Sequence, residues 1–196
     1  MRAPAPAGLA ARDLARGAVL AAGYVVTARL GLAIPLFEPY VTLAWVPSGL
    51  ALAALLLWGL RLAPGVFAGA LIVNLSLGEP FAAALAIALG NTLAAVLAAW
   101  LCRRVLAMDV RLGSVRDVVV LLAAGAVGAS AVSASIGALA LQDIGAFTLE
   151  RAGTSWLGWW AGDAQGVLFF TPLVLAWAVR PRFDRAALKA VALGGG

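Results

Sequence analysis

Histidine is absent from the 196 residues, and Cys102 is the only cysteine. Every catalytic triad that uses histidine is therefore excluded, as is a histidine that accepts a phosphoryl group. A single cysteine cannot form an intrachain disulfide. The sequence also has no phosphate-binding glycine loop and no run of residues with metal-ligand spacing. We therefore expect no catalytic residues, no metal and no cofactor, and we predict that the chain is not an enzyme.

Charged residues are also scarce, at 12% of the chain against 64% hydrophobic residues, and the mean hydropathy is +1.01. Soluble domains carry roughly 25% charged residues, and a water-soluble fold of this length cannot hide so much apolar surface. The net charge of +5 does not indicate nucleic acid, because the basic residues form short clusters between apolar runs and not one basic face. The expected partner is the lipid bilayer.

Apolar stretches separated by short polar segments predict the membrane topology. A helix crosses the bilayer core with roughly 20 residues. When the N-terminus is placed inside, all of the 14 basic residues except Arg29 and Arg151 fall on the cytoplasmic side, as the positive-inside rule requires. The candidate spans are residues 15–36, 41–60, 63–78, 81–101, 117–141 and 156–179.

The predicted fold is therefore an all-α integral-membrane bundle of about six transmembrane helices, with both termini in the cytoplasm. Residues 1–14 form a cytoplasmic arm, residues 15–179 the transmembrane domain, and residues 180–196 a basic cytoplasmic tail or linker. Glycine and proline between residues 59 and 64 predict a tight turn that joins the second and third spans.

Two stripes of small residues at four-residue spacing predict close helix packing, because packing rather than the hydrophobic effect joins helices in lipid. We expect these stripes to face other helices of the same bundle, and a homodimer is the alternative. The stripes are Gly65 and Gly69 in the third span, and Gly125, Ala129, Ser133 and Gly137 in the fifth.

Polar residues inside the spans are the candidates for function, because they are costly in lipid and usually face the bundle interior. Arg29 and Asp163 both lie roughly 10 Å below the same face, and we predict that they form an ion pair. The alternative is that Arg29 extends outward alone while Asp163 lies in a water-filled vestibule. Pro47 in the first turns of the second span predicts a kinked or broken helix start.

The candidate sensing or ligand-binding residues share this polar or aromatic character and map mostly to the outer half of the bilayer. For the two asparagines, hydrogen bonds between helices are the alternative to a ligand pocket. The set is Arg29, Trp45, Ser48, Asn74, Asn91, Trp159, Asp163 and Gln165.

Four short motifs in order carry a family resemblance over roughly residues 20–180. They are Trp45-Val46-Pro47-Ser48-Gly49 within the run 44–53; the run 59–64 with Gly69 and Asn74; Gly90-Asn91-Thr92 leading to Arg103 and Arg104; and Trp159 to Gly166, with Asp163, running to Pro172. In this respect the chain resembles the MASE1 domain, a bacterial membrane-associated sensor module. Family members often carry a glutamate shortly after the Gly-Asn-Thr run, where this chain has Ala94 and Ala95.

The resemblance implies a multi-pass signal-input module in the bacterial inner membrane. Such a module regulates a fused output domain or a cytoplasmic signalling partner, such as a histidine kinase or a diguanylate cyclase. We expect a stand-alone or truncated sensor module without an output domain. The alternative function is a small membrane transporter, or the substrate-binding subunit of an importer of the energy-coupling-factor type.

Overall fold

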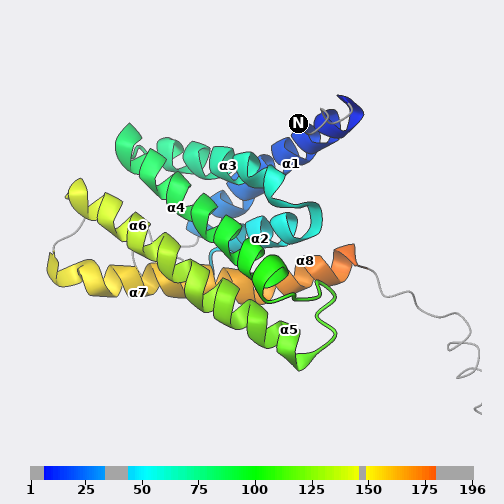
Figure 1. The fold of residues 1–196 in the computed structure, drawn as a ribbon. Helices are drawn as coiled ribbons and strands as arrows, with labels where there is room; N and C mark the ends of the chain where they lie inside the picture. Colours follow the sequence, from blue (N-terminus) through cyan, green and yellow to red (C-terminus); the bar gives the residue numbers. More distant parts are fainter. Residues whose placement is uncertain (1–6, 34–43, 146–148, 180–196) are drawn as a thin grey trace, which may run out of the picture.

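The structure is a computed structural model that describes residues 7–33, 44–145 and 149–179 (Figure 1). Over these ranges the chain is helical apart from short connections, and it contains no strand. The helices are α1 (Ala7–Leu32), α2 (Val46–Trp58), the 3-10 turn η1 (Leu60–Leu62), α3 (Ala63–Ser76), α4 (Phe81–Trp100) with the π-helix η2 (Leu101–Val105), α5 (Val115–Val120), the π-helix η3 (Leu121–Ala129), α6 (Ser130–Asp143), α7 (Leu149–Gln165), the π-helix η4 (Gly166–Phe170) and α8 (Thr171–Ala178).

Several of these elements join end to end into long helices. Among the described residues, three helices are long and apolar enough to cross a membrane, at Phe81–Val105, Val115–Asp143 and Arg151–Ala178, and two shorter apolar helices are Val46–Trp58 and Leu60–Ser76. The all-helical, apolar architecture is thus confirmed. The number of six spans and the side of each terminus remain predictions.

The helix that covers most of the first predicted span begins earlier than expected. Helix α1 starts at Ala7, so part of the predicted arm 1–14 is helical. Helix α1 is not among the three helices that meet the length and hydropathy criteria for a span. The predicted tail 180–196 lies outside the described residues.

Helix α2 is short because it begins inside the bundle. Its 13 residues extend about 20 Å, whereas the hydrocarbon core is about 30 Å thick. Pro47 lies in its first turn, where a missing N–H leaves no hydrogen bond unmade. The Trp45 N–H donates to the carbonyl of Gly162 at 2.8 Å, which fixes the start of α2 against α7. The predicted break at Pro47 is therefore the start of a helix.

The backbones of α2 and η4 are in direct contact. A Cβ added to Gly166 would overlap the carbonyl oxygen of Trp45, and one added to Gly49 would overlap the carbonyl oxygen of Gly166. The buried Thr171 hydroxyl also donates to the Gly49 carbonyl at 3.1 Å. Only glycine allows this approach, because any side chain at either position would occupy the space of the other backbone.

The small-residue stripes pack within the bundle, as predicted. A Cβ on Gly69 would lie 2.7 Å from Cβ of Tyr24 in α1, and a Cβ on Gly125 would lie 3.0 Å from Cδ2 of Leu52 in α2. Gly137 is covered by the ring of Trp159. Each stripe thus brings a neighbouring helix of the same chain close.

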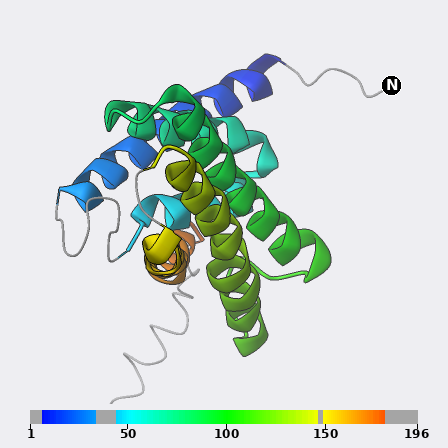
Figure 2. The ribbon, with the colours of Figure 1, turned by 90° about the vertical axis from the view of Figure 1, so that its left-hand side faces the viewer.

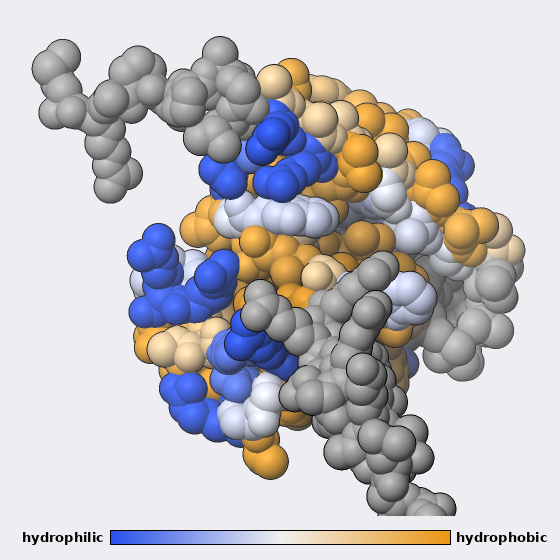
Figure 3. Space-filling view, turned by 90° about the vertical axis from the view of Figure 1, so that its right-hand side faces the viewer, coloured by the Kyte–Doolittle hydropathy of each residue, from blue (hydrophilic) through white to orange (hydrophobic). Residues whose placement is uncertain are grey.

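Hydrophilic residues form patches on one end of the bundle (Figure 3), and several arginines lie at this end. Arg61, in the turn after Gly59, forms an ion pair with Asp13 at 3.1 Å, and Arg103 donates to the Leu56 carbonyl at 2.6 Å. Gly59 has φ +99°, a conformation that glycine adopts readily, which confirms the predicted tight turn. Figure 2 shows the opposite end, at which α6 ends and α7 begins.

Candidate functional site

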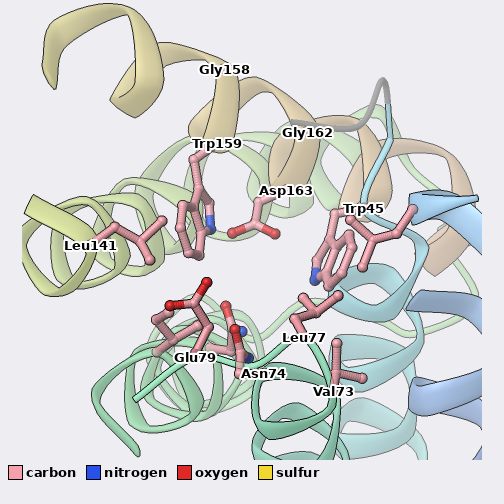
Figure 4. Close-up of a pocket in the computed structure, with 13 residues that line it drawn as sticks. Trp45, Val73, Asn74, Leu77, Glu79, Leu141, Gly158, Trp159, Gly162 and Asp163 are labelled. Atoms are coloured by element: carbon pink, nitrogen blue, oxygen red, sulfur yellow. The ribbon is translucent and has the colours of Figure 1, made fainter. Parts of the chain in front are cut away.

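A partly open cavity lies near the end of the bundle opposite the basic side chains (Figure 4). Its volume is about 50 Å³. Since one water molecule needs roughly 10–15 Å³ of such space, it has room for about three to five molecules of that size. We call it the Asp163 cavity; its lining residues are Leu32, Trp45, Val73, Asn74, Leu77, Glu79, Ile87, Asn91, Leu141, Gly158, Trp159, Gly162 and Asp163.

Asp163 in α7 is the most deeply buried charged residue of the cavity, with 1% of its surface exposed. Its Oδ1 accepts a hydrogen bond from the Ser48 hydroxyl at 2.5 Å. Its Oδ2 is buried and meets no hydrogen-bond donor among the described residues. A buried polar atom of this kind is rare in proteins and normally has a partner. The carboxylate therefore has the capacity to bind one further donor or cation.

Ser48 reaches Asp163 because α2 starts inside the bundle. Its hydroxyl lies in the first turn of α2, close to the helix N-terminus, where the helix dipole favours a negative charge. Ser48 and Asp163 also line a second cavity of about 20 Å³, together with Tyr24 and Ser133. Asp163 thus lines both small cavities.

Two tryptophan rings lie on either side of the carboxylate (Figure 4). Trp159 comes from the turn of α7 that precedes Asp163, and its ring packs on Gly137 of α6. Trp45 meets Tyr24 edge to face, with ring centroids 6.5 Å apart, and its indole N–H points to the Tyr24 hydroxyl at 3.4 Å. Both rings are therefore held in place by the helices behind them.

The two asparagines that line the cavity make different hydrogen bonds. Asn91 in α4 accepts from the Ser133 hydroxyl of α6 at 2.7 Å, which joins two helices. Asn74 in α3 donates from its amide to the Ala70 carbonyl of its own helix at 2.8 Å. The alternative of hydrogen bonding between helices thus applies to Asn91, and both residues also face the cavity.

Most of the residues singled out from the sequence come together at this cavity. Trp45, Asn74, Asn91, Trp159 and Asp163 line it. Ser48 does not line this cavity, but its hydroxyl donates a hydrogen bond to Asp163, which does. Gln165 is partly buried and lines neither of these two cavities.

The predicted ion pair between Arg29 and Asp163 is wrong. Tyr24 and Ala28 are buried, and Arg29, about 100° further round the helix than Ala28, is exposed. Its guanidinium donates to the Ser76 carbonyl at 3.3 Å. The similar depth that was predicted from the sequence is not enough to pair the two residues, because Arg29 lies on the exposed side of α1, whereas Asp163 is buried inside the bundle.

Three contributors to the site were missed as candidate site residues. Glu79 follows α3 and lines the cavity, and only 9% of it is exposed; in the sequence it stands between two predicted spans, where a loop residue is expected. Tyr24 and Ser133 lie within apolar helices; Ser133 was predicted only as part of a packing stripe, and Tyr24 was not singled out. Hydropathy carries no signal that separates these roles.

The chemistry available at the cavity is that of binding. Two carboxylates, two amides and two indoles face it. In the described parts of the chain no three His, Cys, Asp or Glu side chains gather as metal ligands would. The arrangement suits a small molecule held by a buried carboxylate between aromatic rings.

Comparison with known proteins identifies one family. The model of the MASE1 family matches residues 16–191, which is most of the chain. No curated protein and no solved structure matches.

Proposed function

Because the chain belongs to the MASE1 family of membrane-associated sensor domains, we propose that it is a multi-pass signal-input module of the bacterial inner membrane. Its input is a ligand in the Asp163 cavity. Its output is a change in the position of α8, which a cytoplasmic signalling partner or a fused domain, such as a histidine kinase or a diguanylate cyclase, would read.

The observation that carries this proposal is the position of Asp163 on a continuous helix. Asp163 reaches the cavity from α7, and the same helix continues through η4 and α8 to Ala178. A ligand that binds the free Oδ2 of Asp163 therefore acts directly on the helix that leads away from the cavity. No further element is needed between the input and the output.

The π-helix that follows Asp163 supplies a place where this helix can change. Single-turn π segments occur frequently at functional sites, and η4 begins three residues after Asp163. It lies against the second π segment, η3, where Gly125 faces Val167. We infer that the two segments form the element with two arrangements that a switch requires.

The charge distribution supports the direction of signalling. The basic side chains at the end of the bundle farther from the cavity favour a cytoplasmic position for that end. The cavity would then open toward the outside. In this arrangement α8 ends on the cytoplasmic side, beside any output domain.

A reporter fusion tests the proposal. A diguanylate cyclase would be joined after Gly196, and its output compared between the wild type, Asp163→Asn and Asp143→Asn. The control makes the same charge change at an exposed position outside the cavity lining. At equal expression and membrane insertion we expect Asp163→Asn to shift the output about fivefold or more, and Asp143→Asn to leave it unchanged. Equal output from all three proteins would contradict the proposal.

A further inference from the structure

The charges that line the Asp163 cavity are all of one sign. Asp163 and Glu79 both line it, and neither arginine nor lysine does. Among the described residues, the two ion pairs join Arg16 and Arg61 to Asp13 at the other end of the bundle. The cavity therefore has a negative potential that no basic side chain along its wall neutralises. It would attract a cation.

The buried Oδ2 atom of Asp163, which lacks a hydrogen-bond partner, indicates where the charge of that cation would lie. Asp163 Oδ2 is buried without a donor, and the side chain points into the cavity (Figure 4). The Ser48 hydroxyl occupies only Oδ1. A hydrogen-bond donor at Oδ2 would give a partner to the one buried side-chain polar atom that lacks one in the described structure. A cation without N–H groups would instead pair with the negative charge of the carboxylate.

The walls favour an organic cation over a metal ion. Calcium takes six to eight oxygen ligands, and the described side chains offer no group of three acidic or other metal-binding residues. The cavity is instead lined by Trp45 and Trp159 on either side of Asp163 (Figure 4). Indole faces attract ammonium groups, most strongly when water is excluded.

From these features we propose that the Asp163 cavity binds a small organic cation, an amine or a methylated ammonium, with its charge on Asp163 and Glu79 and its carbon groups against Trp45 and Trp159. The cavity volume limits the part that it encloses to roughly five non-hydrogen atoms. The identification of this cation as the stimulus rests on the proposed sensor function, whereas its binding does not.

Tetramethylammonium is the probe that matches this chemistry, and tert-butanol is its neutral counterpart with the same number of non-hydrogen atoms. Binding to the purified 196-residue chain in lipid nanodiscs would be measured by calorimetry, with sodium chloride and calcium chloride as sources of inorganic cations. We expect saturable binding of tetramethylammonium and none of tert-butanol. Absence of saturable tetramethylammonium binding would overturn the proposal, as would equal binding of tert-butanol or stronger binding of either metal ion.

Variants locate the binding. Asp163→Asn is expected to weaken tetramethylammonium binding about tenfold or more, whereas Asp143→Asn leaves it unchanged. Trp159→Leu is expected to weaken binding and Trp177→Leu, at a highly exposed ring, is not. If Asp163→Asn does not fold, the tryptophan pair decides the question alone. Equal affinities within both pairs would refute the assignment of the site.

The binding and reporter experiments fail separately. Specific binding of tetramethylammonium together with an unresponsive reporter would leave the ligand class standing and remove the sensor function. If the reporter output shifts in Asp163→Asn but the wild type does not bind tetramethylammonium, the sensor function stands and the ligand class is refuted.

Discussion

Replacing Gly166 by alanine tests the contact that brings Trp45 and Ser48 to Asp163. The new Cβ would overlap the carbonyl oxygen of Trp45. Ordinary contacts of this kind begin near 3.4 Å, so the start of α2 and the η4 segment would have to separate. Backbone atoms cannot rotate away as a flexible side chain can, which places the cost at the upper end of the range for overpacking, about 3 kcal/mol.

The matched control is Gly153→Ala in the same long helix, where a Cβ meets nothing within 4 Å. Alanine there should be neutral or should stabilise the helix by up to about 1 kcal/mol. For a chain of this size, 3 kcal/mol corresponds to a loss of about 6–12 °C in Tm. Thermal unfolding of the detergent-solubilised proteins, monitored by size-exclusion chromatography, measures this difference.

Equal Tm values for Gly166→Ala and Gly153→Ala would refute the backbone contact between α2 and η4. The position of Trp45 in the cavity wall would then lose its structural basis. Loss of stability in both variants would show that the end of α7 near Gly153 is packed against something, contrary to the open space around that residue.

Two further substitutions test the packing around the cavity. Gly69→Ala places a Cβ 2.7 Å from a side chain of α1 and should lower the free energy of unfolding by about 1–3 kcal/mol. The control Gly23→Ala, in open space, should not lower it. Equal Tm values for the two variants would contradict the α1–α3 contact. Ser133→Ala removes the donor to the buried Asn91 oxygen and should lower the free energy of unfolding by about 1–3 kcal/mol. Ser135→Ala, at an exposed hydroxyl, should lower it little. Thermal unfolding measures the difference between the two variants.

The sequence was sufficient to predict the helical membrane architecture and much of the site. Apolar runs separated by basic clusters locate the helices, because both features follow directly from the cost of burying charge in lipid. The same cost identified Asp163 and Asn91 as inward-facing, since a polar side chain in an apolar helix is best accommodated within the bundle. The spacing of Gly65 and Gly69 likewise predicted a close helix contact.

The parts that could not be predicted depend on the rotation of each helix and on where the backbone leaves the helix. Arg29 was predicted at the depth of Asp163 but does not face the bundle interior, because the rotation of α1 about its axis is set by packing that the sequence of α1 alone does not reveal. Glu79 enters the cavity because the turn after α3, with Gly78 at φ +87°, carries it there. Hydropathy assigns such a residue to a loop and cannot predict its burial.

In the proposed orientation the cavity faces the outside while the end of α8 faces the cytoplasm. The most direct test labels single cysteines in intact cells with a membrane-impermeant maleimide, after replacing the buried Cys102 by alanine. Asp143→Cys reports the cavity end and Arg111→Cys the basic end; both positions are exposed. We expect labelling at position 143 in intact cells and at position 111 only after permeabilisation. The reverse pattern would rule out this orientation.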